Sequence, residues 1–254
     1  MTSLPTYDAD QLGGLLAILP DVDAVELKLT VPSADHRRVL LALGIDSLEA
    51  TIRQVAFIDT PDLRLSDAGL VVRARRTQHK PADLTVKMRP MLPADVPEEL
   101  RGLDGFKVEV DASPTGFTCS CSLTAEAPDR KVKALLADVT RLKGLLSDAQ
   151  RTLLIDRLPA GVALEDLRVL GPLTLLKTKF APEGQESRMV AELWFLPDGT
   201  RILELSTKSA PLEAFRAAAE TKVFLAARQV DLGAPQETKT RTALAALTAA
   251  LDKE

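Results

Sequence analysis

The sequence predicts an α+β fold in which long antiparallel strands carry charged residues on one face. Segments through the first two thirds of the chain alternate apolar and polar residues with period two, as strands do. Two Ala-rich segments near the end instead place apolar residues at helical intervals, and Pro197-Asp198-Gly199 has the composition of a hairpin turn. Because no repeat or long linker interrupts the 254 residues, we expect a single domain over 1–254.

Composition limits the partners of this domain. Hydrophobic residues make up 46% and charged residues 27%, the balance of an ordinary folded protein. A net charge of -4 provides no broad basic field, so we expect no nucleic-acid partner, although a local cluster of cations remains compatible with a small anion. The start lacks the basic and apolar pattern of a secretory signal, and no window has the ~18 apolar residues of a membrane span. We therefore expect a cytoplasmic protein without a membrane partner.

The first strand is predicted over 25–31, where Glu26, Lys28 and Thr30 share one face. Pro32 ends it, and a short helix over 34–43 follows, closed by Gly44. The same alternation returns in three further strands, which cover 51–59, 70–76 and 83–89. Each of the last two again gathers cations on one side, namely Arg73 with Arg75 and Lys87 with Arg89.

The middle of the chain predicts two more strands and a helical insertion. In the strand over 106–111, Lys107, Glu109 and Asp111 share a face, and a further strand is expected over 117–125. We expect an amphipathic helix over 129–146 with Asp129 as its cap, and a short second helix over 150–155. The insertion therefore spans about 129–157.

The last third returns to strands before it ends in helices. Strands are predicted over 167–179, 188–196 and 200–208, with the hairpin turn joining the last two. Helices over 210–229 and 239–251, the C-terminal helices of about 210–251, are expected to pack on the outside of the sheet.

The charged strand faces have two interpretations. In a half-exposed sheet they meet water as weak cross-strand pairs. If the sheet instead curls into a closed barrel with helices outside, the charges point into the lumen. Lys and Arg side chains would repel one another there unless an anion filled the space, so the second interpretation predicts a ligand of high negative charge.

An ordered series of short motifs resembles a known family. It comprises Glu26-Leu27-Lys28, 57–65, 69–76, Thr85-Val86-Lys87-Met88-Arg89, 107–110, 203–208 and 238–241. The series is similar to the CYTH superfamily, the triphosphate tunnel metalloenzymes, which is named for a class IV adenylate cyclase and a thiamine triphosphatase. The resemblance implies an eight-stranded antiparallel tunnel, a closed barrel with outer helices, which binds a small-molecule triphosphate or polyphosphate with Mg2+ or Mn2+ as cofactor.

The resemblance also implies roles for individual residues. It assigns phosphate binding to Lys28, Arg73, Arg75, Lys87, Arg89, Lys177, Lys179, Lys208, Lys239 and Arg241. It assigns metal binding to Glu26, Glu109, Glu204 and Glu192. Within this set, Glu26, Lys28 and Lys87 would be catalytic. Lysine, arginine and carboxylate are the side chains that phosphate oxygens and hard divalent cations require.

Two positions depart from the family pattern. Ala24 stands where a first glutamate is usual, and Ser206 where a second late acid is common, so the predicted cation site carries less negative charge. Three functions remain open. They are metal-dependent hydrolysis of inorganic tripolyphosphate, thiamine triphosphate or a nucleoside triphosphate; conversion of ATP to cAMP and pyrophosphate; and binding of polyphosphate or nucleotide without turnover. A barrel whose charges pair internally and bind nothing is a fourth possibility, and we expect a monomer or homodimer.

Overall fold

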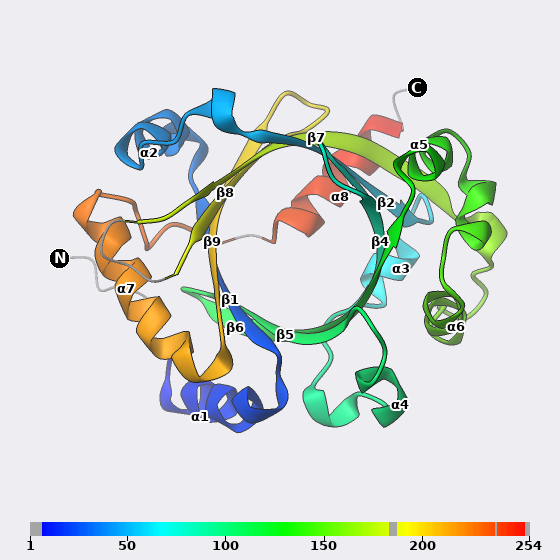
Figure 1. Ribbon diagram of the computed structural model, residues 1–254, viewed down its shortest axis with the longest axis horizontal. Helices are drawn as coiled ribbons and strands as arrows, with labels where there is room; N and C mark the ends of the chain where they lie inside the picture. Colours follow the sequence, from blue (N-terminus) through cyan, green and yellow to red (C-terminus); the bar gives the residue numbers. More distant parts are fainter. Residues whose placement is uncertain (1–6, 183–186, 237, 252–254) are drawn as a thin grey trace.

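A closed barrel of nine strands forms the centre of the molecule (Figure 1). The computed structural model describes residues 7–182, 187–236 and 238–251. Its strands are β1 (Ala24–Val31), β2 (Thr51–Asp59), β3 (Leu70–Thr77), β4 (Ala82–Met88), β5 (Phe106–Ser113), β6 (Gly116–Ala127), β7 (Arg168–Phe180), β8 (Met189–Phe195) and β9 (Arg201–Ser209). Each segment with period-two alternation is therefore a strand, with boundaries within two residues of those expected.

The barrel is neither eight-stranded nor wholly antiparallel, so that expectation is wrong. Around the ring the strands follow the order β1-β5-β6-β4-β3-β2-β7-β8-β9. β1 pairs parallel with β5, placing Glu26 beside Asp111, whereas β9 runs antiparallel on the other side of β1. Strand directions cannot alternate completely around a ring with an odd number of members. Nine strands therefore require a parallel junction, and β1 with β5 forms it.

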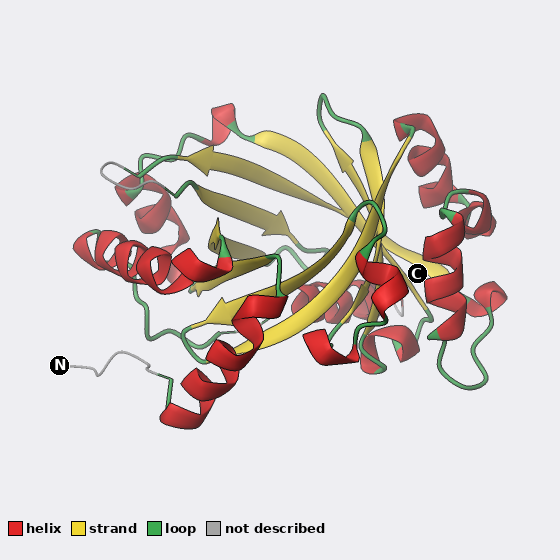
Figure 2. Ribbon diagram, turned by 60° about the horizontal axis from the view of Figure 1, so that its bottom comes forward, coloured by secondary structure: helices red, strands yellow, loops and turns green. Residues whose placement is uncertain are grey.

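Helices surround most of the barrel wall (Figure 2). They are α1 (Ala9–Ile18), α2 (His36–Ala42), α3 (Arg64–Asp67), α4 (Glu98–Arg101), α5 (Asp129–Ala137), α6 (Asp148–Asp156), α7 (Ala214–Ala227) and α8 (Lys239–Leu251). On one side Val39 of α2 and Phe224 of α7 pack over Leu29 and Leu205, which point outward from β1 and β9. Among the described helices, none combines the length and apolar character needed to cross a membrane.

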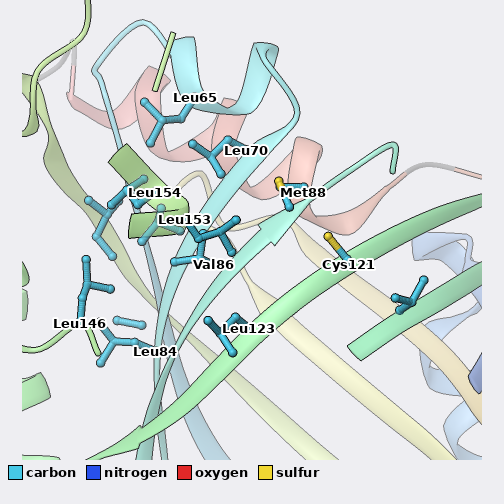
Figure 3. Close-up of a cluster of buried hydrophobic side chains, with 14 of the residues drawn as sticks. Leu65, Leu70, Leu84, Val86, Met88, Cys121, Leu123, Leu146, Leu153 and Leu154 are labelled. Atoms are coloured by element: carbon cyan, nitrogen blue, oxygen red, sulfur yellow. The ribbon is translucent and has the colours of Figure 1, made fainter. Parts of the chain in front are cut away.

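The helical insertion packs on the opposite side of the barrel. Leu84, Val86 and Leu123 point outward from β4 and β6, and Leu153 and Leu154 of α6 meet them in the largest buried cluster (Figure 3). Burial of each such side chain stabilises the fold by about 1.5–3 kcal/mol relative to its exposed state. The same cluster holds the insertion against β3, β4 and β6, so its helices cover the outer face of these strands.

A continuous helix over 129–146 is not present. α5 ends at Ala137, because Asp138 adopts an extended backbone and its carboxylate accepts a hydrogen bond from the Thr140 N–H. A 3-10 helix over Val139–Gly144 follows. Asp129 is the first residue of α5 and not its cap, and its carboxylate pairs with Arg76 of β3. The expected helix therefore begins where the sequence placed it but is divided at Asp138.

α8 lies inside the barrel outline at one end, which corrects the expectation of an outer helix (Figure 1). Its residues Ala243, Leu244 and Leu247 are buried with Val55 and Phe57 in one apolar cluster. Val55 and Phe57 also line the central cavity, so α8 packs against the inner face of the wall. The apolar side of this helix therefore closes one end of its own barrel.

Candidate functional site

The barrel encloses a cavity of about 770 Å³. Alternation along each strand places every second side chain on its wall, as Glu26, Lys28 and Thr30 of β1 illustrate. The half-exposed sheet considered from the sequence is therefore wrong, because the sheet closes and its charged face turns inward.

The cavity wall is strongly basic although the chain is acidic overall. Its cations are Lys28, Arg53, Arg73, Arg75, Lys87, Arg89, Lys107, Lys177, Lys208 and Lys239. Its carboxylates are Glu26, Glu109, Asp111, Glu192 and Glu204. Ten lysines and arginines thus face five carboxylates, while the net charge of the chain is -4. A local excess of this kind favours a polyanion inside the tunnel.

The structure gathers most of the residues that the resemblance assigned to phosphate. Eight of them line the cavity, namely Lys28, Arg73, Arg75, Lys87, Arg89, Lys177, Lys208 and Lys239, as do all four proposed metal ligands. Lys179 and Arg241 are exposed and do not line it. Arg241 lies on α8 away from the buried positions 243, 244 and 247, and Lys179 lies near the end of β7.

Asp111 of β5 is the centre of the first charged cluster. Its carboxylate lies 2.8 Å from Lys28 Nζ and 3.3 Å from both Lys87 Nζ and an Arg89 nitrogen. Burial alone would raise the pKa of Asp111, but these three cations hold it well below its usual range. Burial lowers the pKa of Lys87, and the neighbouring Lys28 and Arg89 lower it further despite Asp111. Three cations thus converge on one carboxylate.

Glu192 and Glu204 form the second cluster, near the closed end. They lie opposite each other on β8 and β9. Lys239 Nζ lies 2.6 Å from Glu192 Oε2 and 2.5 Å from Glu204 Oε1. Lys177 and Arg53 both approach Glu192 Oε1 at 3.1 Å. Burial alone would raise the pKa of Glu192, but Lys239, Lys177 and Arg53 hold it well below its usual range.

Arg73 and Arg75 of β3 form the third cluster with Asp83 of β4. Arg75 Nε lies 2.7 Å from Asp83 Oδ2, and Arg73 donates to the Thr85 hydroxyl at 3.2 Å. Burial, together with the neighbouring Arg75, lowers the pKa of Arg73 to about 10. Arg73 Nε is buried and has no hydrogen-bond partner among the described residues. An unpaired buried N–H is costly. The Arg73 side chain as a whole is 31% exposed and lines the cavity, where its guanidinium can meet an acceptor such as a phosphate oxygen.

Comparison with known proteins supports this architecture. No protein-family model and no curated protein matches the sequence. A solved structure of a proposed adenylyl cyclase from Hippeastrum, described as having a dominant triphosphatase activity, matches with a TM-score of 0.62. It is 17% identical, and the match covers 85% of this chain and 93% of that one. A proposed adenylate cyclase from Bacillus halodurans matches with a TM-score of 0.61 and 14% identity, over 87% and 97% of the two chains. This chain has the CYTH-like tunnel fold.

Four charged residues of the CYTH-like tunnel were not assigned from the sequence, namely Arg53, Asp83, Lys107 and Asp111, although Lys107 was placed on the same strand face as Glu109 and Asp111. Asp111 had a visible signal, because it shares the inner face of its strand with Lys107 and Glu109. Asp83 lies at the start of β4, two residues before Thr85 on the same face. Arg53 had no clear signal, because its neighbours on that face of β2 are the apolar Val55 and Phe57.

The carboxylates of the CYTH-like tunnel do not form a site for a resident metal ion. Each predicted ligand is paired with a lysine: Glu26 with Lys28 at 3.3 Å, Glu109 with Lys208, and Glu192 and Glu204 with Lys239. Within the described ranges, no three His, Cys, Asp or Glu side chains converge to hold a metal. Ala24, where the resemblance expects an acid, is buried and adds no oxygen. The residues present therefore do not fit Mg2+ or Mn2+ held by the protein alone.

Proposed function

We propose that this chain binds a small-molecule triphosphate inside its tunnel and hydrolyses it. The observation that carries the proposal is the convergence of ten lysines and arginines on one cavity of about 770 Å³ that α8 closes at one end. Inorganic tripolyphosphate, thiamine triphosphate and nucleoside triphosphates share the linear phosphate chain that such a wall would neutralise. The two matched structures support the fold in which this site is built.

The cations of the tunnel perform two tasks in this proposal. Lys28, Lys87 and Arg89, which all contact Asp111, also hold phosphate oxygens, and Arg73 adds its guanidinium from the cavity wall. When the terminal phosphoryl group is transferred to water, the same donors stabilise the charge on its oxygens. Because the carboxylates are already paired, we expect Mg2+ or Mn2+ to arrive as part of the substrate, complexed by the phosphate chain.

Binding of polyphosphate or nucleotide without turnover is the second candidate. The pairing of Glu26, Glu109, Glu192 and Glu204 with lysines favours it, since a carboxylate engaged in an ion pair is less available to activate water. The two candidates predict the same affinity and differ in product release.

The test is to incubate the protein with tripolyphosphate, thiamine triphosphate or ATP, in Mg2+, Mn2+ or EDTA. Orthophosphate, pyrophosphate and cAMP are measured together with affinity by calorimetry. We expect orthophosphate release, and a loss of affinity of roughly 10- to 100-fold in Lys87→Met, the loss of one charge-assisted contact. Lys179→Met is the matched control, because Lys179 lies outside the cavity, and it should stay within about twofold.

Each outcome separates the candidates. Tight binding without any product would select the binding module, and pyrophosphate with cAMP would select the cyclase. Absence of both binding and turnover with all three compounds would contradict the proposal, as would equal losses in Lys87→Met and Lys179→Met.

A further inference from the structure

Lys239 is the one cation of the tunnel wall, within the described residues, that comes from a helix and not from a strand. It is the first residue of α8, whose Ala243, Leu244 and Leu247 are buried against the inner wall. This packing holds the helix in place and directs the Lys239 ammonium to the carboxylates of Glu192 and Glu204. The fold thus places the Lys239 ammonium beside Glu192 and Glu204 on the strand wall.

That point requires a positive charge. Glu192 and Glu204 are directly opposite each other on neighbouring strands, and their residues are only 8% and 5% exposed. Two like charges at cross-strand distance and out of water repel each other strongly. A position between two facing carboxylates is one that a divalent cation commonly takes in proteins. Here the ammonium takes it, at 2.6 and 2.5 Å from the two oxygens.

The remaining contacts of Glu192 leave little room for a metal ion. Its Oε2 accepts hydrogen bonds from Lys239 and from the Trp194 indole N–H, the latter at 3.3 Å. Its Oε1 accepts from Lys177 and Arg53. The Lys239 ammonium also lies 5.3 Å from the centre of the Trp194 ring, within the range of a cation–π contact. Both oxygens of Glu192 are therefore engaged by nitrogen donors.

We propose that Lys239 is a built-in counter-ion that replaces a divalent cation between Glu192 and Glu204. The substrate-free tunnel then has no affinity for Mg2+ or Mn2+ at this point, and the charge of the acid pair is neutralised by the protein itself. The role of Lys239 as a counter-ion does not depend on triphosphate hydrolysis, because it concerns the protein without a bound phosphate compound.

The test titrates MnCl2 into the substrate-free protein, in phosphate-free buffer, by calorimetry and by the electron paramagnetic resonance signal of free Mn2+. The wild-type protein should show no saturable binding up to about 1 mM, the weak end of protein sites for such ions. In Lys239→Met the side chain keeps a similar length but loses its charge. We expect this variant to gain one Mn2+ site at least about tenfold tighter than any in the wild-type protein, and a melting temperature that rises with Mn2+.

Three variants control the experiment. Lys239→Arg keeps the positive charge and should remain without Mn2+ binding. Adding Glu192→Gln to Lys239→Met should abolish the gained site, which locates it. Lys179→Met removes an exposed lysine outside the cavity and should behave as the wild-type protein does.

Saturable Mn2+ binding by the wild-type protein with the affinity of Lys239→Met would overturn the proposal, and so would a folded Lys239→Met that gains no site. If circular dichroism shows that Lys239→Met does not fold, the wild-type and Lys239→Arg titrations decide. Micromolar Mn2+ binding by the wild-type protein or by Lys239→Arg contradicts the built-in counter-ion. Absence of Mn2+ binding in both proteins supports it. Tripolyphosphate affinity in EDTA is measured separately. A loss of tripolyphosphate binding would count against the proposed function, whereas the Mn2+ titrations test only the role of Lys239.

Discussion

At the scale of single residues, Asp111 pairs with three cations at once, as Glu192 does in the second cluster. Asp111 lies on β5 and neutralises Lys28 of β1, Lys87 of β4 and Arg89, which directly follows β4. These cations would otherwise face one another across the lumen. Asp111 therefore holds an arrangement that an incoming phosphate chain can use, because each cation is already directed inward.

The ion pairs of Asp111 predict a pH dependence of stability. Its folded-state pKa lies below the unfolded value, so the unfolded chain binds the proton first as the pH falls below about 4. The stabilisation is therefore present at pH 7 and is lost toward acid. In Asp111→Asn we expect a loss of roughly 1–3 kcal/mol in the free energy of unfolding at pH 7. Relative to wild type, this loss should shrink by about 1 kcal/mol at pH 3.

Urea unfolding at pH 7 and pH 3 measures both values. Asp148→Asn serves as control, because its side chain is 98% exposed and its ion pair with Arg151 is a surface pair. A difference between wild type and Asp111→Asn that is the same at both pH values would contradict the role of the ionised carboxylate.

At the scale of elements, α8 shows that an apolar helix face does not reveal which side of a sheet it covers. Its buried residues pack on side chains that point into the barrel, so the helix closes the tunnel and also carries Lys239. The same helix therefore closes one end of the barrel and supplies a positive charge to the site.

The packing of α8 predicts the cost of shortening its side chains. Leu244 is 2% exposed, and Leu244→Ala should lower the free energy of unfolding by about 2–5 kcal/mol through lost burial and the cavity it leaves. Leu251 on the same helix is 41% exposed, and Leu251→Ala should change it by less than about 0.5 kcal/mol. Denaturant unfolding compares the two. Equal, small effects would show that α8 does not pack in the lumen.

At the scale of the whole molecule, charge is sorted between the inside and the outside. The chain carries a net charge of -4, yet cations outnumber carboxylates two to one on the cavity wall. This distribution favours a small polyanion over a duplex, because the charge outside the cavity is acidic overall.

This sorting predicts selective stabilisation by ligands. Tripolyphosphate should raise the melting temperature in EDTA, with an effect that grows with its concentration and decreases at high salt. Duplex DNA at the same phosphate concentration should leave it unchanged. Thermal unfolding followed by circular dichroism gives both values. A shift with DNA, or none with tripolyphosphate, would show that the basic wall is not the binding surface.

The sequence by itself determined the strands and the face of each strand that carries charge. Alternation in 25–31 or 83–89 is a local property of an extended chain, so Glu26, Lys28 and Lys87 share faces in the structure as expected. The three-residue groups that the pattern identified are therefore reproduced without any knowledge of neighbouring strands.

Only the tertiary structure decided which of these faces meet. The parallel junction of β1 with β5, the place of α8 inside the barrel, and the ion pairs of Asp111 and Lys239 all join segments distant in the chain. The exclusion of Lys179 from the cavity has the same origin. Periodicity indicates which residues of one segment lie on each of its two faces. Closure of the ring depends instead on the free energy of all nine strands and their helices together.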